Sequence, residues 1–270
     1  MQPAEHEVTE SVFQYISVWK VLSGDRPGAD LSDRQGLSMC WADSRFPFWN
    51  AVFVTDTLAD APLLASRLRE AAAYMRDKRH SGLVYLCEDY LSEAARQQLD
   101  GIVADAGLAF TMNIAGMAGN MLPYDAALLA APLEFRRVSD EAMLQTYGEI
   151  NAQGYGFTRE AGREALAGSR FWRSTAYSFI GYRDGQAVST AAAIVNGGRL
   201  YLALVATRPD AQRNGYGLAT VRYALQQAYD ATGLTRAVLH ASPAGLPVYQ
   251  RAGFHVTTRF LTYGLAEQRA

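Results

Sequence analysis

The segment from Tyr201 to Tyr229 constrains the fold more than any other part of this 270-residue chain. An apolar stretch, Tyr201–Thr207, has the composition of a buried strand, and a short polar turn separates it from Gly215 and Gly217. These glycines open an amphipathic segment that predicts a helix. The first N–H groups of a helix have no intrahelical partner, and glycine lets an anion approach them without meeting a Cβ atom. The sequence therefore predicts a strand–turn–helix cradle for a phosphate or diphosphate group.

The spacing of the two glycines disfavours the common nucleotide-binding loops. A P-loop needs a lysine followed by serine or threonine, and the only lysines of the chain are Lys20 and Lys78. A dinucleotide-binding loop needs Gly-x-Gly-x-x-Gly, but Thr220 stands where the third glycine would be. A nucleotide-binding enzyme is therefore a weaker hypothesis for this cradle.

The same segment resembles motif A of the GNAT superfamily of acyl-CoA N-acyltransferases, Gln/Arg-x-x-Gly-x-Gly/Ala. Gln212, Gly215 and Gly217 meet that pattern. Downstream, residues 242–254 resemble motif B, Asn-x-x-Ala-x-x-Leu-Tyr-x-x-x-Gly-Phe. Tyr249, Gly253 and Phe254 match it directly, whereas Ser242, Gly245 and Val248 replace the Asn, Ala and Leu. Two motifs in the expected order, each on its expected element, indicate a GNAT domain in the C-terminal half.

Turn residues and hydrophobic periodicity predict the order of elements in residues 132–270. The order is strand, two helices, three antiparallel strands, helix, strand, helix and strand. It fits the α+β class and the GNAT fold that the resemblance implies: a central, mostly antiparallel sheet flanked by helices. We expect this half, residues 132–270, to be the acyltransferase domain.

The N-terminal half, residues 1–125, predicts a related pattern. After a first helix come two strands, a helix, a strand, a helix over Leu91–Ala106 and strands within Leu108–Leu122. We interpret the N-terminal half as a degenerate second copy of the fold, or as an accessory α/β domain. The segment Pro123–Pro132 would link it to the C-terminal half. The N-terminal half would not bind acyl-CoA, because no glycine occurs between Gly36 and Gly82, where its cradle should lie.

The resemblance implies a binding site for acetyl-CoA. Backbone groups of Val205, Ala206 and Thr207 would pair with the pantetheine amides and face the thioester carbonyl, and N–H groups from Arg213 to Leu218 would hold the diphosphate. The cofactor-binding residues expected on this basis are Val205, Ala206, Thr207, Gln212, Arg213, Asn214, Gly215, Tyr216, Gly217, Leu218, Ala219, Ser242 and Tyr249. A plain strand-to-helix turn at the glycines, and a plain helix cap at Ser242, are the alternative interpretations.

Tyr249 is the candidate general acid that protonates the departing thiolate, and packing of its helix against the sheet is the alternative role. The general base stays unassigned, with Glu149, Glu160, Asp184 and water as options. The acceptor site in this fold is commonly walled by the loop between the first two helices. The candidates for substrate binding are Tyr155, Phe157, Trp172 and Tyr201, each of which could instead be a packing residue.

The composition of the chain limits the ligands, the metal sites and the cellular location that we expect. The net charge of −2 argues against a nucleic-acid surface, and no apolar run approaches the length needed to span a bilayer. Cys40 and Cys87 are too few for a disulfide scaffold and lack metal-ligand spacing, as do the histidines, so no metal is expected. We expect a cytoplasmic protein, with a homodimer as an option.

These observations lead to one principal functional hypothesis. The chain would transfer an acetyl group from acetyl-CoA to a primary amine of a small molecule or peptide, by direct attack of the amine on the thioester. The alternative is an acyl-CoA-binding sensor or regulatory module without turnover. The sequence does not identify the acceptor or the length of the acyl group.

Overall fold

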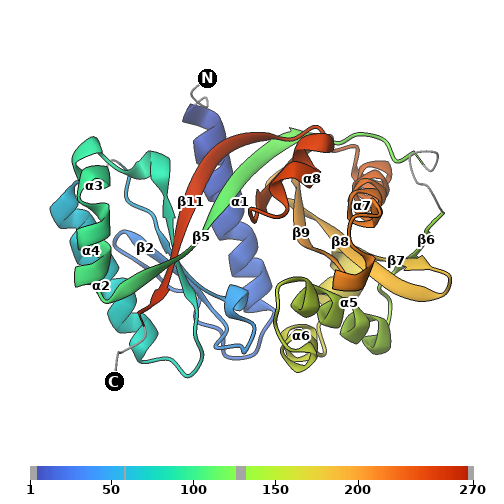
Figure 1. Ribbon diagram of the computed structural model, residues 1–270, viewed down its shortest axis with the longest axis horizontal. Helices are drawn as coiled ribbons and strands as arrows, with labels where there is room; N and C mark the ends of the chain where they lie inside the picture. The colour runs from blue at the N-terminus through green and yellow to red at the C-terminus, as the bar shows by residue number, and fades with distance from the viewer. Residues whose placement is uncertain (1–4, 58, 126–131, 267–270) are drawn as a thin grey trace. The chain divides into compact units, whose positions relative to one another are not determined.

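The computed structural model describes residues 5–57, 59–125 and 132–266, and the chain divides into two compact units (Figure 1). The first unit comprises Met1–Gly116 and Val256–Ala270, and the second comprises Met117–His255. These units differ from the expected domains 1–125 and 132–270, because the C-terminal strand packs in the sheet of the first unit. Most of the expected connection, residues 126–131, lies outside the described residues.

The second unit is built on a sheet with strand order β10-β9-β8-β7-β6. Its strands are β6 (Glu134–Arg137), β7 (Tyr177–Arg183), β8 (Gln186–Asn196), β9 (Arg199–Thr207) and β10 (Arg236–Ala241). Neighbours from β6 to β9 run antiparallel, and β10 runs parallel to β9. The mixed α+β architecture expected from the sequence is confirmed.

Helices cover both faces of this sheet (Figure 1). On one face lies α7 (Tyr216–Thr232), which connects β9 to β10 as a parallel pair requires. On the other lie α5 (Glu141–Gly154) and α6 (Arg159–Leu166), each begun by a side-chain cap, from Asp140 and Thr158 respectively. A π-helical turn at Phe171–Thr175 precedes β7, and the short α8 (Leu246–Arg251) follows β10.

The first unit has a similar arrangement around its own sheet. Strands β2 (Leu37–Trp41) and β3 (Asn50–Val54) are antiparallel, α2 (Ala61–Arg76) follows, and β4 (Leu83–Cys87) lies parallel to β3. This is the connectivity of β8, β9, α7 and β10 in the second unit. The long α1 (Glu5–Gly24) precedes it, and β1 (Asp33–Arg34) pairs with β2. Among the described residues, no helix has the length and apolar character needed to cross a bilayer.

The last strand of the chain explains the difference in boundaries. Strand β11 (His255–Leu265) pairs antiparallel with β4, from Phe260 opposite Cys87 to Tyr263 opposite Val84. It therefore joins the sheet of the N-terminal unit, although it follows the second unit in sequence. Strand β5 (Leu108–Asn120) likewise passes from the first unit into the second after Gly116. The helix expected over Leu91–Ala106 is two helices, α3 (Glu93–Gln97) and α4 (Leu99–Asp105).

Helices α5 and α6 approach each other at two glycines. A Cβ atom added to Gly148 would overlap the backbone of Gly162, and one added to Gly162 would overlap that of Gly148. Close contact of the two backbones places the end of α5 beside the end of β9, where a Cβ at Gly154 would lie 3.0 Å from the Cβ of Ala206.

We expect Gly148→Ala to destabilise the second unit, since the added methyl group forces the two helices apart. Over-packing of this kind costs about 1–3 kcal/mol in the free energy of unfolding. The matched control is Gly101→Ala in α4, where nothing lies within 4 Å of the added Cβ and alanine is favoured over glycine by about 0.5–1 kcal/mol. Thermal unfolding of the two variants should shift in opposite directions. An unchanged or raised midpoint for Gly148→Ala would contradict the close helix contact.

Candidate functional site

Strands β9 and β10 separate at their carboxyl ends. Their parallel ladder pairs Leu200, Tyr201 and Leu202 with Ala237, Val238 and Leu239. Strand β9 continues to Thr207 and remains paired with β8, whereas β10 continues to Ala241. Ligands of α/β sheets bind beside the carboxyl ends of parallel strands. The divergence opens such a place between the two strands.

A β-bulge in β9 accompanies this divergence. Between the pairs Ala192–Ala203 and Thr190–Ala206, β9 has two residues, Leu204 and Val205, where β8 has only Ala191. Leu204 takes a positive φ of 46°. A bulge bends its strand and increases the local twist, so β9 turns away from β10 just beyond the last paired residue.

The turn after β9 leads into the N-terminus of α7 with a backbone suited to anions. Arg213 and Gly215 have positive φ angles of 66° and 79°, and Gly215 is the N-cap without a side-chain cap. The N–H of Ala219 makes the first intrahelical bond, to the carbonyl of Gly215. The N–H groups before it point out of the helix end, where the helix dipole favours negative charge.

Gly217 has a second reason to be glycine. A Cβ atom at this position would lie 2.8 Å from the Thr207 Oγ1 at the end of β9. The helix thus begins in close contact with the strand that precedes it. A larger residue would push the helix end away from the strand, and it would also cover the exposed N–H groups.

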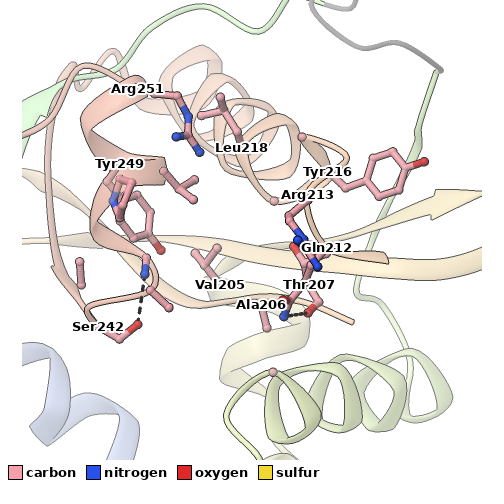
Figure 2. A pocket seen from close by; sticks show the side chains of 18 of the residues that line it. Val205, Ala206, Thr207, Gln212, Arg213, Tyr216, Leu218, Ser242, Tyr249 and Arg251 are labelled. Carbon is pink, nitrogen blue, oxygen red and sulfur yellow. Dashed lines mark hydrogen bonds between the residues drawn. The ribbon is translucent and has the colours of Figure 1, made fainter. Parts of the chain in front are cut away.

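A cavity of about 400 Å³ lies between the end of β9, the start of α7 and helix α8 (Figure 2). Gln212 and Arg213 stand on the α7 side, and Tyr249 and Arg251 on the α8 side. The lining residues are Gly154, Tyr155, Val205, Ala206, Thr207, Gln212, Arg213, Gly215, Tyr216, Gly217, Leu218, His240, Ala241, Ser242, Ala244, Gly245, Pro247, Val248, Tyr249 and Arg251.

The charge of this lining suits an anionic ligand. Arg213 and Arg251 contribute positive charge, and none of the residues that line the cavity is a carboxylate. Both arginines are exposed, so they can reorient toward a phosphate. Positive side chains and a free helix N-terminus therefore act on the same space.

Tyr249 faces this cavity from α8 and is nearly buried. Burial raises the pKa of its phenol well above the ordinary value, and the neighbouring Tyr155 adds to the shift, since two phenolates repel each other. The phenol therefore keeps its proton through the neutral and mildly alkaline range and can act only as a donor there. The ring also packs edge-on against Phe254, at a centroid distance of 6.3 Å.

The structure brings together most of the expected cofactor-binding residues. Those that line the cavity are Val205, Ala206, Thr207, Gln212, Arg213, Gly215, Tyr216, Gly217, Leu218, Ser242 and Tyr249. Asn214 does not; its amide donates to the carbonyls of Ala211 and Gln212 and thereby braces the turn. Ala219 does not line the cavity either, and it is buried in a hydrophobic cluster with Leu133, Val188 and Ala211. Ligand contacts of the other residues stay a prediction.

Ser242 combines the two roles considered for it. It lines the cavity, and its Oγ accepts a hydrogen bond from the N–H of Gly245 at 3.4 Å (Figure 2). The hydroxyl thus caps the turn that leads into α8. The same cap holds Tyr249 in place, because the N–H of Tyr249 bonds to the carbonyl of Gly245.

Of the four acceptor-site candidates, only Tyr155 lines the cavity. Phe157 follows it in the loop after α5, and Trp172 is buried beside Tyr147 at a centroid distance of 5.9 Å. Tyr201 is buried in β9 and its hydroxyl lies 2.8 Å from Nδ1 of His240. Trp172 and Tyr201 therefore do not line the cavity, although Tyr201 contacts His240, which does, and their role in acceptor binding stays a prediction.

Sequence reasoning missed several lining residues, notably Arg251 and His240. Arg251 lies two residues after Tyr249 within the second motif, and the positive charge of that position was a signal. His240 lies at the carboxyl end of β10, beside Ser242. Burial lowers the pKa of its imidazole, so the ring is neutral near neutral pH. Among the described residues, no group of three or more histidine, cysteine or acidic side chains could hold a metal ion.

The carboxylates considered as general bases are engaged in ion pairs. Glu149 and Glu160 both contact Arg163, at 2.6 and 2.8 Å, and Asp184 contacts Arg183 at 3.1 Å. None of the three lines the cavity. The base stays unassigned.

The equivalent turn of the first unit has the opposite electrostatics. Helix α2 begins at Asp60, whose carboxylate accepts the N–H of Leu63, and Pro62 removes another donor. Asp56 adds a second negative charge before the helix, although Arg67 pairs with it at 2.6 Å. This helix end is already satisfied by its own carboxylate, so it offers nothing to a diphosphate.

Part of the second unit is similar in sequence to a known protein family. Residues 143–254 match the family described as Acetyltransferase (GNAT) family, and the N-terminal half is not matched by that family. The matched region contains β7 to β10, α7, α8 and the cavity. No curated protein is significantly similar in sequence.

Solved structures resemble nearly the whole chain in fold. A GCN5-related N-acetyltransferase from Kribbella flavida is 17% identical with a TM-score of 0.65, covering 92% of this chain and 94% of that one. A GCN5-related N-acetyltransferase from Sphaerobacter thermophilus is 16% identical with a TM-score of 0.62, covering 94% and 91%. A tandem GNAT protein from the clavulanic acid biosynthesis pathway is 10% identical with a TM-score of 0.51, covering 79% and 74%. These likenesses concern the fold, and they are consistent with a second, divergent GNAT-like copy in the N-terminal half.

The raised pKa of Tyr249 has a measurable consequence. A phenol with the ordinary pKa of about 10 ionises with exposed tyrosines, whereas Tyr249 should stay protonated in that range. Ultraviolet titration of wild type and Tyr249→Phe should therefore show the same phenolate absorbance up to the onset of alkaline unfolding. A loss of one phenolate equivalent in the variant at this pH would show that Tyr249 titrates normally.

Proposed function

We propose that the region that matches the GNAT acetyltransferase family, residues 143–254, transfers an acetyl group from acetyl-CoA to a primary amine. The amine belongs to a small molecule or a peptide and attacks the thioester directly. Members of this family bind acyl-CoA and use an amine acceptor. Our proposal adds to these family properties that the acyl group is acetyl and that the acceptor is a primary amine of a small molecule or a peptide.

The divergence of β9 and β10 beside the uncapped α7 is the observation that carries this proposal. A pantetheine chain between the strands would reach the unpaired edge of β9 at Val205 and Ala206. The diphosphate would then meet the N–H groups at the start of α7, with Arg213 and Arg251 supplying positive charge. Acetyl-CoA, with its pantetheine chain at one end and its diphosphate further along, would contact the strand edge, the helix end and both arginines at once.

The reaction needs a neutral amine, a donor to the developing oxyanion and a proton for the thiolate. The amine nitrogen bonds to the carbonyl carbon, and the electron pair of the C=O moves to oxygen. Backbone N–H groups near Val205 stabilise that negative charge. The C–S bond then breaks as the Tyr249 phenol gives its proton to the departing sulfur. This transfer depends on the position of the phenol beside the sulfur, because the raised pKa of Tyr249 makes it a weaker acid than the thiol. The nitrogen loses its proton to water or to a base not yet identified.

A thiol-release assay with the purified protein, acetyl-CoA and a panel of amines tests this proposal. We expect free CoA to appear only with an accepting amine. Tyr249→Phe should lower turnover about 100-fold, the range expected of a general acid, and should leave the affinity for acetyl-CoA nearly unchanged. Tyr229→Phe, a partly exposed tyrosine of α7 outside the cavity, is the matched control and should keep full activity.

Different failures of this assay have different meanings. Binding of acetyl-CoA without release of CoA for any amine would favour the sensor over the enzyme. Equal loss of turnover and affinity in Tyr249→Phe, or no loss of either, would contradict the role of general acid. The absence of acetyl-CoA binding in a folded protein would contradict the assigned cavity.

A glycine substitution tests the diphosphate cradle separately. We expect Gly217→Ala to weaken acetyl-CoA binding about tenfold, which corresponds to about 1.4 kcal/mol. Thr207→Ala/Gly217→Ala removes the clash with the Thr207 hydroxyl in the free protein, and it should still bind weakly because the methyl group covers the helix N–H groups. Calorimetry should give one acetyl-CoA per chain in wild type, since Asp60 blocks the corresponding helix end of the first unit. Recovery of full affinity in the double variant would show that Gly217 serves packing alone.

A further inference from the structure

The β-bulge of β9 places one residue in an unfavourable conformation. Leu204 has a φ of 46°, in the left-handed region that a leucine rarely adopts. Such a conformation persists only where the surrounding structure over-determines it, and it often lies at a functional site. The contacts that hold Leu204 are therefore informative.

Two hydroxyl groups converge on the carbonyl oxygen of Leu204. Tyr147 of α5 donates to it from Oη at 3.0 Å, and Thr190 of β8 donates to it from Oγ1 at 3.2 Å. Both side chains are fully buried. Leu204 lies in the bulge and has no partner in the register of β8 and β9, and the two hydroxyl groups supply its carbonyl with the hydrogen bonds that a regular ladder would give.

A third buried side chain, that of Asn151, forms hydrogen bonds to both residues that donate to Leu204. Asn151 of α5 donates from Nδ2 to Thr190 Oγ1 at 2.9 Å and to the backbone carbonyl of Tyr147 at 3.0 Å. Because the Thr190 hydroxyl oxygen accepts a hydrogen bond from Asn151, its own O–H group is free to donate to the carbonyl of Leu204. The three side chains Tyr147, Asn151 and Thr190 form one chain of hydrogen bonds, which we call the bulge clamp.

The clamp determines the direction of the next N–H group. In a trans peptide the C=O of one residue and the N–H of the following residue point in opposite directions. A carbonyl of Leu204 held toward Tyr147 therefore turns the N–H of Val205 to the other side of the strand. Val205 itself lines the cavity.

We propose that the bulge clamp positions the Leu204–Val205 peptide so that the N–H of Val205 donates to the thioester carbonyl oxygen. This inference rests on the proposed acetyl transfer, and it assigns to Tyr147, Asn151 and Thr190 a role in turnover although none of them lines the cavity. They are positioning residues, because they act through the backbone of β9. A donor fixed in advance stabilises an oxyanion more than one that must reorient during the reaction.

Packing alone does not require this arrangement. Phenylalanine and valine would fill the volumes of Tyr147 and Thr190 without burying hydroxyl groups, which is costly unless they are hydrogen-bonded. Here both hydroxyls meet one carbonyl oxygen, that of the residue with the positive φ. The convergence on that single atom is what distinguishes the clamp from general contact between α5 and the sheet.

The test uses Tyr147→Phe and Thr190→Val, each of which removes one hydroxyl and preserves volume. We expect each to lower kcat about tenfold, while the Kd of acetyl-CoA changes less than twofold because the diphosphate contacts at α7 are intact. Since both hydroxyls serve one carbonyl, the effects of the two changes on kcat should not multiply in the double variant. The infrared band of the thioester carbonyl of bound ¹³C-labelled acetyl-CoA should shift to higher frequency in the variants, as a lost hydrogen bond requires.

The matched control is Tyr74→Phe in the first unit. Tyr74 is also buried, and its hydroxyl donates to Asp30 at 2.9 Å. The variant therefore loses one hydrogen bond of a buried tyrosine hydroxyl, to a partly exposed carboxylate, far from β9 in the sequence. We expect a lower thermal unfolding midpoint, with unchanged kcat and an unchanged infrared band.

The outcomes separate this inference from the function on which it rests. Active wild type with full kcat and an unshifted carbonyl band in Tyr147→Phe would overturn the clamp and leave the acetyl transfer standing. A parallel loss of kcat and affinity in Tyr147→Phe would also overturn it, because the residue would then only maintain the shape of the cavity. Wild type that binds acetyl-CoA without turnover would overturn the proposed transfer, while the infrared shift would still decide whether Val205 is positioned by the clamp.

Discussion

One additional residue in strand β9 determines the geometry of the site. The bulge at Leu204 bends the strand just beyond its last pair with β10, so the two parallel strands separate where α7 begins. Without it, β9 would continue beside β10 and its edge groups at Val205 and Ala206 would be consumed by the ladder. The bulge has an energetic cost, and three buried side chains offset that cost with hydrogen bonds. The cavity thus depends on three side chains that do not themselves line it.

The two units show how the same connectivity can gain or lose an anion site. Each has two antiparallel strands, a helix and a parallel strand. In the second unit Gly215 starts the helix and leaves its N–H groups to a ligand. In the first, the carboxylate of Asp60 occupies them. The residues around each helix start therefore determine whether its first N–H groups are open to an anion, and in the first unit Asp56, Asp60 and Pro62 make that end unsuitable.

Local patterns predicted the second unit well, because its signals are short-range. Capping residues, hairpin glycines and alternating strands located its elements, and the motif glycines lie where the strand–turn–helix pattern placed them. The helix expected over Leu91–Ala106 was wrong in one respect, since the chain breaks it at Gln98. The expected domain boundary also differs from the compact units, because pairing of β11 with β4 joins residues far apart in sequence. No local pattern reports which sheet a terminal strand will enter.

The bulge clamp was beyond prediction for a related reason. Bulges are often marked by glycine, whereas this one occurs at a leucine inside an unbroken apolar run, Tyr201–Thr207. Its donors come from a different helix and a different strand, and as isolated residues Tyr147 and Thr190 are indistinguishable from core side chains. Tyr201 shows the same limit: its position on β9 suggested a ligand contact, and the structure gives it a hydrogen bond to His240, which lines the cavity, while Tyr201 itself does not line it. Residues that act through the backbone can be recognised when their hydrogen bonds converge on one backbone atom, here the carbonyl oxygen of Leu204. The direction of that C=O bond is known only from the three-dimensional structure.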